Sequence, residues 1–169
     1  MPPYAPPLTD MRFTLNDVIR LENLTRQPGF EAVEASLSDQ ILEEAGKFSS
    51  NVLAPLNFEG DRSGAKIENG VVRPASGFGE AYNQGADAGW NSVPFDQTYG
   101  GQGLPWTLTT AIWEMWESSN MAFSLCPLLT QAAIDALERH GSEEQKSTYL
   151  EKLVSGEWTG TMNLTEPQS

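Results

Sequence analysis

The sequence predicts an all-α domain with one small β-hairpin, followed by the first strand of a second, β-rich domain. Apolar residues recur every three or four positions through most of residues 14–155, which places them on one face of a helix. An Asn-Gly pair at 69 and 70 separates two short β-prone runs, as in a tight hairpin. From Gly156 the pattern alternates, as in a strand. We therefore expect a helical domain over residues 1–155 and the start of a β-domain over residues 156–169.

The first two helices are predicted from apolar spacing and from the prolines near their ends. A short amphipathic helix is expected from Thr14 and should end before Pro28. Its core face comprises Leu15, Val18, Ile19 and Leu21. A second helix is expected after Phe30, and Pro55 is expected to stop it. Its apolar stripe comprises Val33, Leu37, Ile41, Ala45, Phe48 and Val52.

A glycine-rich segment, "YGGQGLP", precedes the next helical pattern. It places Gly100, Gly101 and Gly103 ahead of Pro105, and proline is preorganised for a first helical turn. A glycine loop at the start of a helix is one way to bind phosphate. This segment lacks the G-x-G-x-x-G spacing and the Lys-Ser/Thr pair of such loops. A structural turn is the favoured interpretation, and the helix after it, apolar on nearly every side, is expected to lie centrally.

The last two helices are expected to meet at a tight corner. Gly141 suits the left-handed position that ends a helix, and Ser142 with Gln145 forms a capping-box signature for the next one. His140, the single histidine, falls in a last helical turn, where an imidazolium interacts favourably with the helix dipole. With no second histidine and no nearby cysteine, nothing in the sequence supports a metal site.

Composition excludes several classes of partner. The 169 residues carry 23 acidic and 10 basic side chains, for a net charge of -13, which would repel a nucleic-acid backbone. The N-terminus lacks a secretory signal, and no apolar run is long enough to cross a bilayer. We therefore expect a cytoplasmic protein without nucleic-acid partners. Cys126, the single cysteine, lies in an apolar run and is expected to be a buried, inert thiol.

Two segments near the C-terminus carry a resemblance to a known family. "GSEEQKSTYLEKLVSGEW", followed closely by "MNLTEPQS", resembles the junction between the helical domain and the β-domain of flavin-dependent acyl-CoA dehydrogenases. "YGGQGLP" is also similar to that family. "YAPPLTDMRF" and "EEAGKFSSNVLAPLN" resemble its longer branch, which includes methylthiopropionyl-CoA dehydrogenases. The resemblance covers essentially the whole chain.

The resemblance implies a cofactor and a set of residues that contact it. In the family, flavin adenine dinucleotide (FAD) lies between the β-domain and a C-terminal helical bundle. The "TEP" segment is similar to the one that lines the flavin ring, which implies main-chain contacts from Met162 and Leu164. Thr165 would donate hydrogen bonds through its hydroxyl and its backbone N–H. Such donors suit a ring that gains charge when it accepts a hydride from the substrate.

The resemblance also implies what these residues do not supply. The family motif continues from "TEP" into Gly-Ser-Asp, whereas Ser169 is the last residue here, and the family's catalytic glutamate lies in the C-terminal bundle. Glu166 is therefore not assigned the role of the catalytic glutamate, and no residue of this chain is assigned as catalytic. The expectation is an N-terminal fragment that neither retains FAD nor turns over substrate.

The resemblance further implies an acyl-CoA substrate, an electron acceptor and a homo-oligomer for the full-length enzyme. Four apolar residues are candidates to line the acyl group, although core packing is an alternative for each: Phe123, Leu125, Leu128 and Leu129. Two other interpretations of the chain stay open. One is a non-catalytic helical interaction module, and the other is a short gene product whose β-domain comes from another chain.

Overall fold

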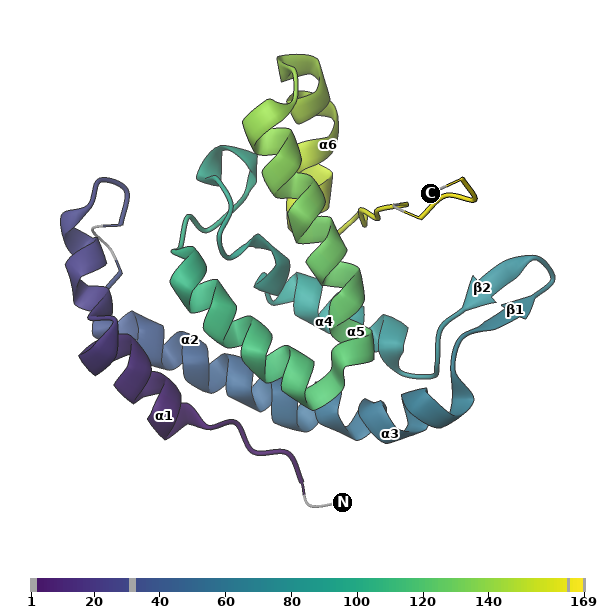
Figure 1. Ribbon diagram of the computed structural model, residues 1–169, viewed down its shortest axis with the longest axis horizontal. Coiled ribbons are helices and arrows are strands. Elements are labelled where there is room, and N and C mark those ends of the chain that lie inside the picture. The colour runs from purple at the N-terminus through teal and green to yellow at the C-terminus, as the bar shows by residue number, and fades with distance from the viewer. Residues whose placement is uncertain (1–2, 31–32, 164, 169) are drawn as a thin grey trace.

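The computed structural model describes residues 3–30, 33–163 and 165–168. Within them the fold is helical with one two-stranded antiparallel sheet, as the sequence predicts (Figure 1). The elements, in chain order, are α1 (Leu8–Phe13), π turn η1 (Thr14–Val18), 3-10 helix η2 (Leu21–Arg26), α2 (Ala35–Phe48), π turn η3 (Ser49–Leu53), α3 (Ala54–Ser63), β1 (Lys66–Glu68), β2 (Val71–Arg73), α4 (Phe78–Asp87), 3-10 helices η4 (Trp90–Ser92) and η5 (Gln97–Tyr99), α5 (Trp106–His140) and α6 (Glu143–Ser155).

The first helix differs from the prediction in its start and in its buried face. It begins at Leu8, and Thr14 instead opens the π turn η1. Leu15 and Leu21 are buried, as expected, but Val18 and Ile19 are exposed. A π turn holds more residues than an α turn, so the apolar face that α-helical spacing predicts rotates away from the core.

Pro55 does not stop the second helix, which corrects the prediction. The chain continues from α2 through η3 into α3, and Pro55 lies in the first turn of α3. A proline is tolerated there because its missing N–H would have no helical partner at that position.

The hairpin is confirmed. β1 pairs antiparallel with β2, with Glu68 opposite Val71. Asn69 and Gly70 form the turn with φ values of 53° and 78°, the left-handed conformation that a tight hairpin requires. The hairpin projects beyond α3 and α4 (Figure 1), and all its strand residues are exposed. It is a surface excursion, as the sequence predicts.

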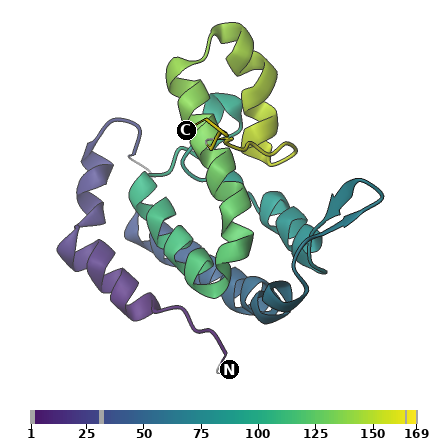
Figure 2. The same cartoon turned by 45° about the vertical axis from the view of Figure 1, so that its right-hand side comes forward.

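Helix α5 is the central element, and it is bent. Asn120, with φ −160° and ψ 87°, divides it into two halves. The first half packs beside α2, and the second half rises to pack against α6 (Figure 2). The first half buries Leu108, Ile112, Met115 and Trp116, which confirms its central place.

Of the two predictions about the corner between α5 and α6, the capping box is confirmed and the left-handed glycine is wrong. Ser142 and Gln145 form the predicted capping box. Gly141 is not left-handed, because its φ is −68°. Glycine is needed there for a different reason: an added Cβ would lie 2.6 Å from the carbonyl oxygen of Leu137.

Two apolar clusters hold the helices together. The larger lies between α1, α2, α4 and the first half of α5, and it includes Leu42, Phe48 and Trp116. The smaller joins the second half of α5 to α6 and consists of Phe95, Ile134, Leu150, Leu153 and Val154. The second half of α5 is therefore fixed by contacts on the side that faces α6.

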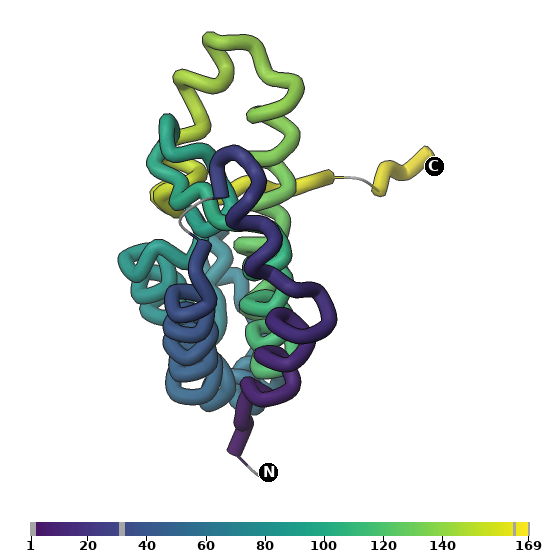
Figure 3. Tube along the Cα trace, turned by 90° about the vertical axis from the view of Figure 1, so that its left-hand side faces the viewer, coloured from purple at the N-terminus to yellow at the C-terminus, as the bar shows by residue number. Residues whose placement is uncertain are grey.

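The chain after α6 forms no strand in its described residues, and the start of a β-domain at residue 156 stays a prediction. Gly156 closes α6 with φ 81°, and residues 157–163 and 165–168 are irregular. We call the described residues 157–163 and 165–168 the tail, and Figure 3 shows its end running away from the helical body. A β-strand needs a neighbouring strand to pair its backbone groups, and the described residues offer the tail none.

Candidate functional site

The chain leaves α6 through two points of contact, Gly156 and Trp158. Tyr82 on α4 donates a hydrogen bond from its hydroxyl to the carbonyl of Gly156 at 2.9 Å. The Trp158 ring lies 6.1 Å from the Tyr149 ring, and Lys152 Nζ lies 4.4 Å from the Trp158 centroid. These contacts fix the direction in which the chain leaves α6.

A third contact holds the tail against the second half of α5. The Gly160 N–H donates to Thr130 Oγ1 at 3.1 Å. A Cβ on Gly160 would lie 2.8 Å from the Cβ of Ala133, so glycine permits this close approach. The tail is therefore anchored on α5 just before the residues that the family resemblance connects with the flavin.

Those residues are exposed where they are described. The Met162 side chain is 56% exposed, and Thr165 is exposed as well. Leu164 lies outside the described residues. The cofactor role of these three residues stays a prediction.

The four residues predicted to line an acyl group are not brought together. Phe123 is buried in the larger cluster, with its ring 5.8 Å from that of Trp116. Leu125 and Leu128 are 52% and 40% exposed, and Leu129 is half-buried. Phe123 thus packs in the core of this structure, whereas Leu125 and Leu128 are exposed side chains on the second half of α5. The acyl-binding role stays a prediction.

The bend in α5 creates a groove that the sequence did not reveal. Ligand sites are typically clefts of about 300–1,000 Å³, and an open groove of ≈ 610 Å³ lies between the two halves of α5. Trp113 Nε1 donates to Gln131 Oε1 at 2.7 Å and so joins the two halves across it. Leu128 and Trp106 also line the groove. Helical spacing alone could not show it, because an unbent α5 would separate these residues.

The glycine loop is a structural turn, because its amides already bond to the protein. The Gly101 N–H donates to the carbonyl of Asp96, and the Gly103 N–H donates to the carbonyl of Phe95, both at 2.9 Å. A Cβ on Gly101 would lie 1.9 Å from the Phe95 carbonyl oxygen. The side chain of Asp96 accepts from the backbone N–H of Thr98, which lowers the Asp96 pKa. The loop therefore does not present these amides to a phosphate.

Cys126 is exposed, which corrects the expectation of a buried thiol. Partial burial still raises the pKa of the thiol, so the group stays protonated and weakly nucleophilic at neutral pH.

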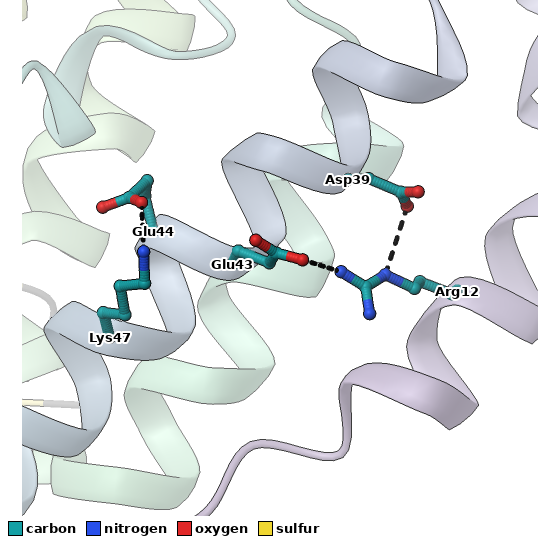
Figure 4. A network of polar contacts seen from close by, with 5 residues as sticks. All are labelled: Arg12, Asp39, Glu43, Glu44 and Lys47. Carbon is teal, nitrogen blue, oxygen red and sulfur yellow. Dashed lines mark hydrogen bonds and ion pairs between the residues drawn. The ribbon is translucent and has the colours of Figure 1, made fainter.

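The charged side chains form ion pairs between and along the helices and do not gather into a metal site in the described residues. Arg12 on α1 pairs with Asp39 and Glu43 on α2, and Lys47 pairs with Glu44 along α2 (Figure 4). Among the described residues no group of three or more His, Cys, Asp or Glu side chains could hold a metal ion. In the same part of the chain, no helix is both long and apolar enough to cross a membrane.

Comparisons with known proteins agree in pointing to one family. The family model "Acyl-CoA dehydrogenase, N-terminal domain" matches residues 37–157. A 3-methylmercaptopropionyl-CoA dehydrogenase from Ruegeria pomeroyi is 42% identical over 166 residues, which is 98% of this chain and 28% of that protein. A butyryl-CoA dehydrogenase from Syntrophomonas wolfei is 35% identical over 133 residues, covering 76% of this chain and 22% of that protein.

A more distant relative matches over the same extent. The broad-specificity linear acyl-CoA dehydrogenase FadE5 of Mycobacterium tuberculosis is 27% identical over 170 residues, covering 98% of this chain and 27% of that protein. The chain thus spans less than a third of the length of the curated relatives that it matches.

Proposed function

Because the chain belongs to the acyl-CoA dehydrogenase family, we propose that it supplies the helical domain and one flavin-contacting edge of an FAD-dependent enzyme. That enzyme oxidises an acyl-CoA thioester to the 2,3-enoyl-CoA, and a separate electron acceptor reoxidises it. Residues 156–169 begin its β-domain, and the complete enzyme is a homo-oligomer. The observation that carries the proposal is the anchored tail, which holds exposed residues at the position that resembles the family's flavin segment.

Two features of the described tail residues support their proposed contact with a flavin. Met162 and Thr165 are exposed, and within the described residues their backbone amides donate no hydrogen bond. The Thr165 hydroxyl is equally unused within that part of the chain. Exposed donors of this kind can bind the polar edge of a planar heterocycle without first breaking a bond inside the protein.

Each residue has a distinct part in this proposal. Thr165 donates from its hydroxyl and its backbone N–H to the flavin ring, while Met162 and Leu164 contact the ring through their main chain. When bound, FAD supplies the acceptor for the hydride that leaves the β-carbon of the acyl group. Leu125, Leu128 and Leu129 border the acyl chain along the second half of α5. The base that removes the α-proton is not assigned to a residue of this chain.

The exposed apolar side of α5 supports a second candidate, a non-catalytic module that docks a partner. Met121 is 59% exposed and lies beside Leu125 on that side, and exposed apolar residues that gather on one face favour an interface. A short gene product completed by another chain would use the same face.

Two measurements separate these functions. An open reading frame that continues past the codon for Ser169 with Gly-Ser-Asp supports the first function and removes the other two. We call this chain, continued through the rest of the relatives' length, the family-length protein. If it binds FAD and reduces a dye only when acyl-CoA is present, the proposed function holds. A family-length protein that binds no flavin overturns it.

A further inference from the structure

The hydroxyl of Thr130 is arranged to accept the Gly160 amide. Thr130 is 1% exposed, and its Oγ1 donates to the carbonyl of Cys126, four residues earlier on α5, at 3.0 Å. A threonine hydroxyl has one hydrogen and two lone pairs. Because the hydrogen is used within the helix, a lone pair faces the tail, and it accepts the Gly160 N–H at 3.1 Å.

The partner of this bond is fitted to the surface of α5. A Cβ on Gly160 would lie 3.4 Å from Thr130 Cα and 2.8 Å from the Cβ of Ala133. A side chain at position 160 would therefore push the tail outward and lengthen the bond to Thr130. The contact therefore needs two features: a hydroxyl on α5 that accepts the hydrogen bond, and a glycine on the tail that can approach α5 closely.

In the described chain, this bond comes directly before the exposed residues Thr161 and Met162. Upstream, the Tyr82 hydroxyl donates a hydrogen bond to the carbonyl of Gly156, and the Lys152 ammonium group lies over the Trp158 ring. Downstream, the described residues Thr161 and Met162 make no hydrogen bond within the described chain. Thr130 thus determines where the tail leaves α5 and in which direction the next residues run.

We propose that Thr130 is a positioning residue: its hydroxyl holds the Gly160 amide and so sets the place of the segment that contacts the flavin. This proposal rests on the proposed function. It assigns to Thr130 no contact with flavin or substrate, only control over Met162 and Thr165 through the backbone. The acyl-binding side of α5 and the flavin segment are then joined by one side chain.

The chain offers a matched control for this role. Thr110 makes the same type of bond within α5, from its Oγ1 to the carbonyl of Trp106 at 2.9 Å, but it holds no tail amide. Thr130→Val removes the hydroxyl with nearly the same shape, and Thr130→Ser restores it. Gly160→Ala disturbs the same contact from the tail side.

The first test measures hydrogen exchange of the Gly160 amide by NMR in this 169-residue chain. Thr130→Val should raise the exchange rate about tenfold, the effect of losing one ordinary hydrogen bond. Thr130→Ser should keep the original rate, and Thr110→Val should not change it. An unchanged rate in Thr130→Val, or an equal rise in Thr110→Val, overturns the proposal.

The second test measures FAD affinity in the family-length protein. Thr130→Val and Gly160→Ala should each weaken FAD binding about tenfold, with Thr130→Ser and Thr110→Val close to the unchanged protein. Faster Gly160 exchange with unchanged FAD affinity overturns the positioning role. A parent protein that binds no FAD defeats the proposed function, and the Gly160 exchange rates then still decide whether Thr130 holds the tail.

Discussion

The Asn120 side chain donates from Nδ2 to the carbonyl oxygen of Leu53 at 3.1 Å, which joins the bend of α5 to the end of the π turn η3. Its Oδ1 accepts the backbone N–H of Phe123 at 3.1 Å and so caps the second half of α5. Asn120 is 1% exposed, and both ends of its amide are satisfied. One buried residue therefore fixes the direction of the helix half that carries the candidate site.

Replacing Asn120 should lower the stability of the folded chain. Asn120→Ala removes a helix cap and leaves the Leu53 carbonyl without this donor, so we expect a loss of about 3 kcal/mol in the free energy of unfolding. Urea unfolding monitored by circular dichroism measures it. Asn83→Ala on the exposed side of α4 is the control, and it should change stability by less than about 0.5 kcal/mol. Equal losses in the two variants would contradict the role given to Asn120.

Two neighbouring glycines should respond differently to the same substitution. Gly101→Ala forces a Cβ against the Phe95 carbonyl and should lower the free energy of unfolding by at least ~3 kcal/mol. Gly100 has a φ of 86° but no atom within 4 Å of an added Cβ, so Gly100→Ala should cost only about 1 kcal/mol. Thermal unfolding of both variants checks this order, and the reverse order would refute the account of the loop.

Glu138 should make stability depend on pH. Partial burial raises the pKa of its carboxyl group in the folded state, although its Oε1 accepts the Asp96 N–H at 3.2 Å. A raised folded-state pKa means that the stabilising contribution is complete below the unfolded pKa and is lost as pH rises through the folded pKa.

Glu138→Gln should therefore increase the free energy of unfolding at neutral pH, and the gain should disappear in acid, where the carboxyl is protonated in both states. Urea titrations at the two pH values measure it. Glu151→Gln, an exposed position on α6, corrects for the removal of one negative charge. A gain that persists in acid would argue against burial of Glu138 as the cause.

The leucines on the second half of α5 should influence which acyl group is accepted. In the family-length protein, Leu125→Phe or Leu128→Phe reduces the room beside the acyl chain, so kcat/KM should fall more for long than for short acyl-CoA substrates. One methylene of misfit is worth about 1–3 kcal/mol in such discrimination. Val72→Phe on the exposed hairpin is the control. Unchanged selectivity at unchanged stability would exclude the leucines from the acyl site.

Local signals in the sequence were sufficient for some elements and not for others. The Asn69–Gly70 turn and the Ser142 capping box depend on residues close together in the chain, so their sequence patterns predict them directly. The continuation of the helix through Pro55 and the bend at Asn120 depend on distant contacts, including the bond to Leu53. Apolar spacing does not encode such contacts.

The candidate site was predictable only in part. The "TEP" segment indicated Thr165 and its neighbours through family resemblance, while the anchor between Thr130 and Gly160 joins positions 30 residues apart. The described residues after Gly156 are irregular, because β-propensity alone provides no pairing partner for a strand. Phe123 is buried in the core, whereas Leu125 and Leu128 are exposed on α5, and their acyl-binding role stays a prediction.

The most direct test of the central claim compares flavin retention by two proteins: this 169-residue chain and the family-length protein. Each is mixed with FAD and desalted, then assayed for visible absorbance and for acyl-CoA-dependent dye reduction. We expect the family-length protein to be yellow and active. The chain alone should be colourless and inactive, since the few contacts of one edge cannot offset the cost of immobilising a large cofactor. Flavin retained by the chain alone, with turnover, would contradict the account and require a base within it, with Glu166 the first residue to replace.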